Sequence, residues 1–227
     1  MSTRPPVHRL TKAEIVYLGS HTCKAHRHSF LDHYSCYLKE SPQRDKTAII
    51  DIETSNLKAD YGIILTWCIK PLGETKIAQG VITSADIKKG RKGDEDRRVT
   101  IDLIKEMQNY DKLIGYYSKR FDLPYIRARA LNMGIDFPFF GSIQHVDVFD
   151  IVKNRFCMSR KSQEVACRFL LGHTDKTHFD GSIWRDAARG DTKALRKVLE
   201  HNIYDVQDLE KLYLKVREFA RRHDVSI

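Results

Sequence analysis

The sequence predicts an α/β or α+β fold in which helices cover a sheet. Three observations predict it: β-rich segments come first, a strand and a helix then alternate, and the last third is mostly helical. The chain has 227 residues, of which 41% are hydrophobic, which is long enough for one buried core and a small appendage. We expect a single main globular domain.

The strand-forming part begins near residue 46. The segments TAIIDIET (47–54), YGIILTWCIK (61–70) and TKIAQGVIT (75–83) are rich in β-branched and aromatic residues and are separated by turn formers. Three such segments in succession predict an antiparallel meander. The charged stretch that follows, residues 86–98, is interpreted as a solvated loop or the frayed start of a helix.

The remainder of the chain is mostly helical. A short apolar segment at residues 111–117 is typical of a buried strand. Helical spacing, or a proline near the start and a glycine at the end, predicts the following helices: residues 98–109, 121–134, 162–172 and 191–199, and a long final helix to about residue 221.

Charge and hydropathy indicate the environment and the partner. No apolar run approaches the ~20 residues that cross a membrane, and the first ten residues lack the apolar core of a secretory signal. We therefore expect a cytoplasmic protein with no membrane partner. The 39 Lys and Arg exceed the 30 Asp and Glu, for a net charge of +9. This excess favours a polyanionic partner, nucleic acid first.

Acidic residues in apolar surroundings are the candidate functional residues. Asp51 and Glu53 lie two apart on one strand and therefore on one face of it, which is either solvated or functional. Asp122 lies where a strand meets a helix, and is alternatively an N-cap. Asp205 borders the apolar stripe of the last helix, with His201 one turn earlier. A lone acid at that place is usually a surface charge.

Together, these carboxylates predict a metal site. Carboxylates from a first strand, a strand-to-helix junction and a late helix converge only around something cationic, because repulsion and desolvation oppose their packing. Oxygen ligands select Mg²⁺ or Mn²⁺. Two such ions suit the in-line hydrolysis of a phosphodiester. We predict that Asp51, Glu53, Asp122 and Asp205 hold two ions.

The order of these motifs resembles that of a known family. From about residue 46 to residue 220 the chain resembles the ribonuclease H-like DEDD 3′–5′ exonucleases, most of all the branch related to the proofreading domains of family B DNA polymerases. The family's three motifs are matched by IDIET, by GYYSKRFDLPYI with Asp122, and by EHNIYDVQDL with Asp205. The resemblance implies a ribonuclease H-like mixed sheet flanked by helices. It also implies that HVDVFDIVKNR (145–155) is a strand entering a helix.

The resemblance implies release of nucleoside 5′-monophosphates from single-stranded 3′ ends of DNA, with RNA as the second candidate, and partners in replication or repair. The chain departs from the family at one position. One branch has His five residues before the last Asp and the other has Tyr four before, whereas His201 lies four before Asp205. His201 is the candidate general base, since imidazole accepts protons near neutral pH. An ordinary helical histidine is the alternative, and Tyr204 is a weaker candidate.

Residues beside the second motif are candidates for nucleic-acid contact. Tyr117 and Phe121 offer aromatic rings for stacking on a terminal base. Lys119 and Arg120 offer cations for phosphates. Burial in the core is an equal alternative for Phe121.

The His- and Cys-rich segment 21–37 is a separate feature of the predicted N-terminal region 1–45, which also contains a helix at 12–20; residues 46–227 are the predicted nuclease domain. Cys23, His28, His33 and Cys36 have a C-x4-H-x4-H-x2-C spacing that suits a structural Zn²⁺. His21 and His26 are spare ligands. A basic, histidine-rich surface with two buried cysteines is the alternative. The odd number of cysteines opposes a disulfide framework, and the other three are interpreted as core, namely Cys68, Cys157 and Cys167.

Three rival functions are compatible with parts of this pattern. The first is an endonuclease on the same scaffold that cuts RNA–DNA hybrids or branched DNA. The second is a nucleic-acid-binding module that no longer turns over, against which the presence of all four carboxylates argues. The third is a nuclease of the His-Cys finger type using residues 21–37, whose further catalytic signature the sequence lacks.

Overall fold

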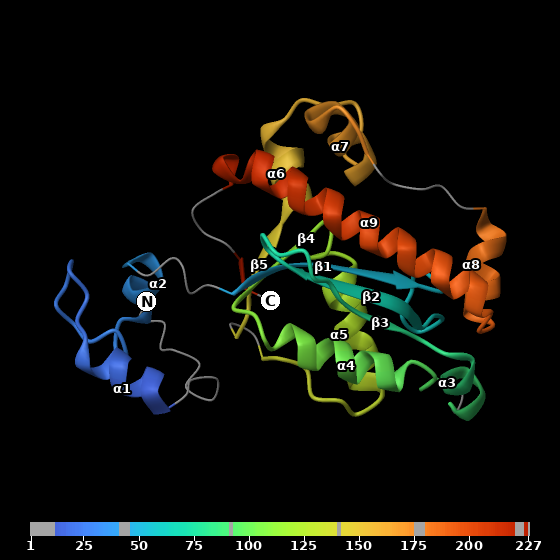
Figure 1. Cartoon of the computed structure of the whole chain (residues 1–227), viewed down its shortest axis with the longest axis horizontal. Helices are drawn as coiled ribbons and strands as arrows, with labels where there is room; N and C mark the ends of the chain where they lie inside the picture. The colour runs from blue at the N-terminus through green and yellow to red at the C-terminus, as the bar shows by residue number, and fades with distance from the viewer. Residues whose placement is uncertain are drawn as a thin grey trace. The chain divides into compact units, whose positions relative to one another are not determined.

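A computed structural model describes residues 12–40, 46–90, 93–139, 142–174, 180–220 and 225–226 (Figure 1). The chain forms two compact units, residues 1–45 and residues 46–227. Among the described residues, none of the helices combines the length and the apolar composition that a membrane crossing requires.

The larger unit is built on a mixed sheet with the strand order β3-β2-β1-β4-β5-β6. The predicted antiparallel meander is confirmed, because β2 pairs antiparallel with both β1 and β3. β4 runs parallel to β1 and β5 parallel to β4, whereas β6 is antiparallel to β5. The strands are β1 (Thr47–Thr54), β2 (Ile64–Pro71), β3 (Ala78–Val81), β4 (Lys112–Gly115), β5 (Gln144–Asp147) and β6 (Val225–Ser226).

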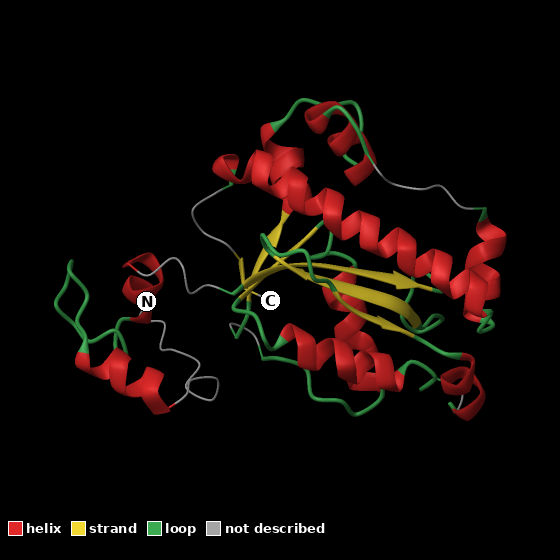
Figure 2. Cartoon of the chain, in the orientation of Figure 1, coloured by secondary structure: helices red, strands yellow, loops and turns green. Residues whose placement is uncertain are grey.

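Helices cover both faces of this sheet (Figure 2). The alternation along β1 separates two cores: Ile50 and Ile52 join the core with α4 and α5, whereas Ile49 joins the core with α6, α7 and α9. The helices are α3 (Ser84–Lys89), α4 (Arg97–Met107), α5 (Asp122–Asn132), α6 (Val148–Arg155), α7 (Gln163–Leu171), α8 (Gly181–Ala188), α9 (Thr192–Val216) and the 3₁₀ turn η3 (Arg217–Phe219).

The structure differs from the sequence-based prediction in several places, including helix α8, which was not predicted. Residues 84–89 form helix α3, because Thr83 and Asp86 make a reciprocal capping box that offsets the charged composition. The two helices predicted after residue 190 are one 25-residue helix, α9, whereas residue 221 lies outside the described part of the chain. Cys157 is exposed in the loop after α6, so its assignment to the core was wrong.

The N-terminal unit contains two short helices, α1 (Lys12–Ser20) and α2 (Tyr34–Glu40). Between them, a single antiparallel bridge joins Thr22 to Ser29. Its buried cluster consists of Leu18, Cys23, Phe30, Cys36 and Tyr37. Two of these five residues are cysteines of the predicted zinc set.

A buried ion pair ties the sheet to α5. Arg129 of α5 donates through Nε and Nη2 to the carboxylate of Asp96, which also accepts the backbone N–H of Ile64 at the start of β2. Both side chains are almost inaccessible, at 5% and 0% exposure. This carboxylate therefore anchors two elements at once.

We expect Asp96→Ala to lower the free energy of unfolding by about 3–5 kcal/mol, because it leaves the Arg129 charge buried without its carboxylate. The control is Asp102→Ala, whose exposed pair with Arg98 on α4 is worth at most about 1 kcal/mol. Urea unfolding of the three proteins measures both differences. Equal losses in the two variants would contradict the anchoring role of Asp96.

Candidate metal-binding active site

The first part of the candidate site is the α9 face of β1. Because side chains alternate along a strand, Asp51 and Glu53 share the face of Ile49, which packs against the core that α9 closes. On this face Asp51 lies opposite Cys68 of β2. Burial raises the pKa of the Cys68 thiol, and the charges of Asp51 and Glu53 raise it further. Cys68 therefore stays a neutral core residue, as predicted.

Helix α9 brings the second part of the site onto this face. Nε2 of His201 lies 3.7 Å from Oε1 of Glu53 and 3.6 Å from Oδ2 of Asp205. Potential ligand atoms of the three residues all lie within 4.8 Å of one another. His201 and Asp205 are buried although α9 is an outer helix, because they flank its apolar stripe, which includes Val198 and Val206. A strand and a helix thus hold a compact group of two carboxylates and one imidazole.

Asp122, the first residue of α5, lies against the same strand from the side. Its Oδ1 accepts the backbone N–H of Ile52, the residue between Asp51 and Glu53, at 3.1 Å. The N-cap position belongs to Phe121, which makes no side-chain cap, so Asp122 is not the N-cap considered above. Burial raises the pKa of Asp122 to about 7, although the backbone N–H groups of Ile52 and Asp122 lower it. A divalent cation beside this carboxyl group would favour its charged form.

The structure brings the five predicted site residues together to different degrees. The 4.8 Å group contains Glu53, His201 and Asp205, whereas Asp51 and Asp122 lie outside it. Both are nevertheless tied to the group's own elements: the carbonyl oxygen of Asp51 accepts Nδ2 of Asn202 at 3.4 Å, and Asp122 binds β1. Carboxylate donors on three elements form a donor set that suits Mg²⁺ or Mn²⁺.

Asn202 is a residue that the sequence analysis missed. It is fully buried and connects α9 to β1 beside Asp51. Its position between His201 and Asp205 was the only available signal, and an asparagine at one helical position does not by itself indicate a role.

A tight turn after β4 supports Asp122. The carboxylate of Asp147 accepts the backbone N–H groups of Tyr117 and Lys119 and caps α6 through Phe149. Tyr117 has φ of +61°, a conformation that is costly for a bulky residue. A Cβ atom at Gly115 would lie 2.1 Å from Oγ of Ser118. Asp147 therefore has a structural role, because it keeps the turn in a strained conformation.

The four residues predicted to touch nucleic acid lie in or next to this turn. The ring of Tyr117 is 45% exposed. Phe121 is half-buried and packs against the α4/α5 core. Arg120 lies 2.8 Å and Lys119 3.9 Å from carboxylate oxygens of Asp150. These two cations are thus partly neutralised within the protein.

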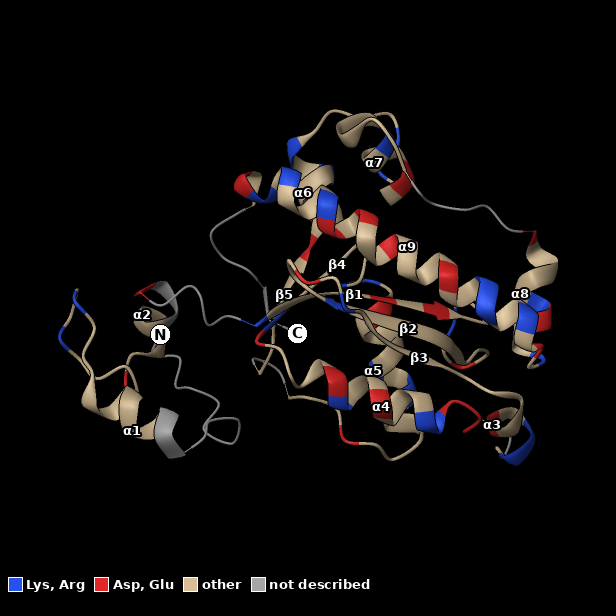
Figure 3. Ribbon diagram, viewed as in Figure 1, with Lys and Arg blue, Asp and Glu red and all other residues tan. Residues whose placement is uncertain are grey.

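A group of exposed basic residues lies elsewhere, on α8 and the first turns of α9 (Figure 3). The group consists of Arg185, Arg189, Lys193, Arg196 and Lys197, and we call it the α8–α9 basic patch. Trp184, from the middle of α8, places its ring perpendicular to that of His201, with 6.0 Å between centroids. Helix α8, which carries part of the patch, thus contacts the candidate site through Trp184. The sequence analysis did not predict this patch, because its residues come from two helices that meet only in the folded protein.

The N-terminal histidines and cysteines form a second group of potential ligands. Cys23, His33 and Cys36 come together as predicted, and the fourth member is His26. His28, which the spacing analysis chose, is not in the group, and His26 had been only a spare ligand. Two short repeats, C-x2-H at Cys23 and H-x2-C at Cys36, were the signal that could have identified His26.

The comparison with family models decides the ancestry of the larger unit. The RNase H superfamily model matches residues 48–217. The chain belongs to the RNase H superfamily. This membership confirms the predicted mixed α/β fold, and it makes the carboxylate group on β1, α5 and α9 the place to seek divalent-metal chemistry.

A solved structure has the same superfamily fold. The family B DNA polymerase from the hyperthermophilic archaeon Pyrobaculum calidifontis matches with a TM-score of 0.60 and 19% sequence identity over 76% of this chain. The match covers 24% of the polymerase chain, so this RNase H superfamily protein spans about a quarter of that enzyme. No curated protein sequence matches the chain.

His145 of β5 contacts the turn after β4, and its burial makes the stability of the protein depend on pH. Its Nε2 lies 2.9 Å from Oγ of Ser118. The pKa of His145 is lowered to about 4, mainly by burial and also by the charge of Lys119, whereas the charge of Asp150 raises it. In the unfolded chain a histidine has a pKa of ~6.5. Between these values the unfolded state binds a proton that the folded state does not, so the stability from His145 is lost as pH falls through this window.

We expect wild-type protein to lose about 1.5 kcal/mol more than His145→Gln in free energy of unfolding between pH 6.5 and 5, because the unfolded histidine becomes mostly protonated over this interval and each full pH unit contributes at most about 1.4 kcal/mol. Urea unfolding at the two pH values measures this difference. Burial raises the pKa of Asp147, so this residue contributes to stability with the opposite pH dependence. Both proteins contain Asp147, and its contribution therefore cancels in the comparison. Equal pH dependence in both proteins would contradict the neutral, buried state of His145.

Proposed function

We propose that residues 46–227 are a 3′–5′ exonuclease that hydrolyses phosphodiester bonds of DNA, with RNA as the second candidate substrate. The observation that carries the proposal is the group of Glu53, His201 and Asp205 within 4.8 Å, beside Asp51 of β1 and Asp122 of α5, which accepts a hydrogen bond from β1. Membership of the RNase H superfamily and the fold shared with a family B DNA polymerase support it.

In this proposal Asp51, Glu53, Asp122 and Asp205 hold two Mg²⁺ or Mn²⁺ ions. When bound, such a pair supplies an activated water nucleophile and stabilises the leaving oxygen of an in-line displacement. The chain's own contribution is to hold the carboxylates at fixed positions on a strand, a helix start and a second helix. The Ile52 N–H that binds Asp122 fixes one of these positions relative to the others.

His201 is proposed to accept the proton of the attacking water. Its Nε2 lies within 4 Å of two of the carboxylates, and its side chain is 8% exposed. The ring of Trp184 lies at 81° to the His201 ring, with 6.0 Å between their centroids. A base must lie within reach of the proton that it removes, and His201 is the titratable non-acidic group of this cluster.

The α8–α9 basic patch is proposed to bind the phosphates of the strand that enters the site. Its cations are exposed and clustered, whereas Lys119 and Arg120 already face Asp150. Tyr117, which is exposed in the turn before Asp122, offers a stacking surface.

Two other functions predict different products when the protein is incubated with nucleic acid. An endonuclease of this superfamily would cut internally, and a silent module would bind nucleic acid without cleavage. The presence of both halves of the 4.8 Å group, on β1 and on α9, favours a functioning metal site over the silent module.

The deciding assay uses 3′-labelled and 5′-labelled single strands of DNA and RNA of one sequence, with Mg²⁺, Mn²⁺ or EDTA. We expect loss of the 3′ label as a mononucleotide with either metal ion, and none in EDTA. Asp51→Ala and Asp205→Asn should each lower the rate by about 10³-fold, since losing metal charge stabilisation costs several kcal/mol. Asp102→Asn, an exposed acid on α4, is the control.

Internal fragments in this assay would replace the proposal by an endonuclease. Metal-independent binding without cleavage of any substrate would replace it by the binding module.

A second test isolates His201. We expect His201→Ala to lower kcat by about 10²–10⁴-fold while leaving DNA affinity within about twofold, because a general base acts on the chemical step. His173→Ala, an exposed histidine of the same unit, should leave kcat unchanged. Single-turnover cleavage and filter binding measure the two quantities. A variant with normal kcat would remove His201 from the mechanism.

A further inference from the structure

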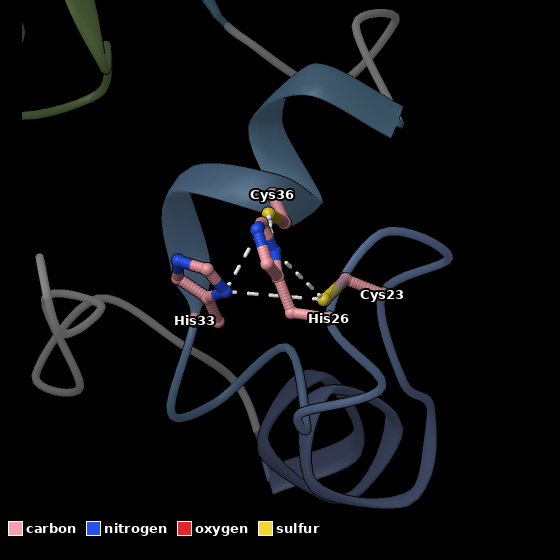
Figure 4. A group of neighbouring side chains, drawn as sticks. All are labelled: Cys23, His26, His33 and Cys36. Atoms are coloured by element: carbon pink, nitrogen blue, oxygen red, sulfur yellow. Dashed lines mark hydrogen bonds between the residues drawn. The ribbon is translucent and has the colours of Figure 1, made fainter.

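The N-terminal unit holds four ligand atoms around a common centre (Figure 4). Sγ of Cys23 lies 3.8 Å from Nδ1 of His26 and 3.9 Å from Nδ1 of His33. Sγ of Cys36 lies 3.4 Å and 3.6 Å from the same two nitrogens. All four atoms lie within 4.8 Å of one another. The side chains point inward from a turn, a loop and a helix start.

These separations match the edges of one coordination tetrahedron. Sulfur at ~2.3 Å and nitrogen at ~2.05 Å from a single ion are ~3.6 Å apart when the angle is tetrahedral. The four measured S···N distances, 3.4–3.9 Å, lie on both sides of that value. Two irons bridged by sulfide would hold the cysteines and histidines on different metals and hence further apart. The set of two thiolates and two imidazoles in this geometry favours Zn²⁺.

The backbone prepares the first pair of ligands. Arg27 donates its N–H to the carbonyl of Cys23 and has φ of +57°, which closes a tight turn around Cys23 and His26. The same turn directs His26 toward Cys36, while His28 uses its backbone carbonyl to accept the N–H of Cys23.

The second pair of ligands lies at the start of α2. Cys36 donates its N–H to the carbonyl of His33, so the H-x2-C segment is a single turn that presents both ligand atoms on one side. The two ligand segments are thus short local turns joined by only six residues, 27–32. A tetrahedral ion would crosslink the turn to the helix.

The hydrophobic core of this unit is too small to replace such a crosslink. Among the described residues of this unit the core contains five buried side chains, and Cys23 and Cys36 are two of them. Units of about 40 residues or fewer usually need disulfides, metals or oligomerisation to fold, and the cysteines of the described residues form no disulfide. Without an ion, the core would consist of Leu18, Phe30 and Tyr37 around two thiols and two imidazoles.

We propose that Cys23, His26, His33 and Cys36 bind one structural Zn²⁺ and that the fold of the N-terminal unit depends on it. The four protein ligands complete the tetrahedron, so the site has no open position for a substrate or water and is structural rather than catalytic. The proposal does not rest on the nuclease function, because it concerns a different unit, different ligands and a different ion.

The primary test is the zinc content of full-length protein, purified without chelator, by inductively coupled plasma mass spectrometry. We expect about one Zn²⁺ per chain in wild type and in His28→Ala, and about tenfold less in His26→Ala and Cys36→Ser. His28 is the matched control because it is a neighbouring exposed histidine outside the ligand set. Zinc loss in His28→Ala with retention in His26→Ala would overturn this ligand assignment. Zinc-free wild type would overturn the site itself.

A second measurement does not depend on the folding of a ligand-deficient variant. Full-length protein is reconstituted with Co²⁺ after zinc removal, and its visible spectrum is compared with those of His26→Cys and His28→Cys. We expect tetrahedral ligand-field bands in all three, and a stronger thiolate-to-cobalt charge-transfer band only in His26→Cys, which gains a third sulfur ligand. A stronger band in His28→Cys alone, or iron–sulfur absorption in protein as isolated, would overturn the proposal.

Discussion

The mutual repulsion of carboxylates beside β1 is the constraint on which the larger unit depends. Asp51 and Glu53 lie on one face of the strand, Asp205 approaches from α9, and Asp122 is held against the strand by the Ile52 N–H. Packing alone does not gather acids in this way, because desolvation and like charge both oppose it. The surrounding structure is correspondingly rigid, with apolar cores on both sides of β1. The packed strands and helices around β1 therefore fix the positions of the carboxylates.

The supporting residues show how that rigidity is achieved. The carboxylate of Asp147 accepts backbone N–H groups and lies 3.8 Å from Nη1 of Arg120, and it holds Tyr117 in a left-handed conformation next to Asp122. Asp96 and Arg129 do the equivalent for α5 and β2. In both cases a buried carboxylate is bound by several groups at fixed positions. Its burial costs desolvation free energy, but the surrounding chain has few other conformations that satisfy the carboxylate. Such groups fix the positions of the site residues without belonging to the site.

The sequence predicts the elements of the fold well because most of its signals are local. The meander, α4, α5 and the acidic positions on β1 follow from periodicity and turn formers that act over a few residues. The α8–α9 basic patch and the contact of Asn202 with β1 depend on which elements meet in space, and no local pattern encodes that. The choice of His26 over His28 is an intermediate case. A spacing of two residues from each cysteine was visible, but the turn at Arg27 decides which imidazole points inward.

The continuity of α9 has a consequence for how this protein can change over evolutionary time. One uninterrupted helix of 25 residues carries part of the basic patch, His201 and Asp205, and the core stripe that ends at Val216. Each residue added to or removed from a helix rotates everything beyond it by about 100°. A single-residue insertion between the patch and His201 would turn either the patch or the ligands away from β1. Insertions and deletions are thus tolerable in the loops at either end of α9 but would disrupt the site if they fell within it. The helix fixes the spacing and orientation of the basic residues relative to His201 and Asp205.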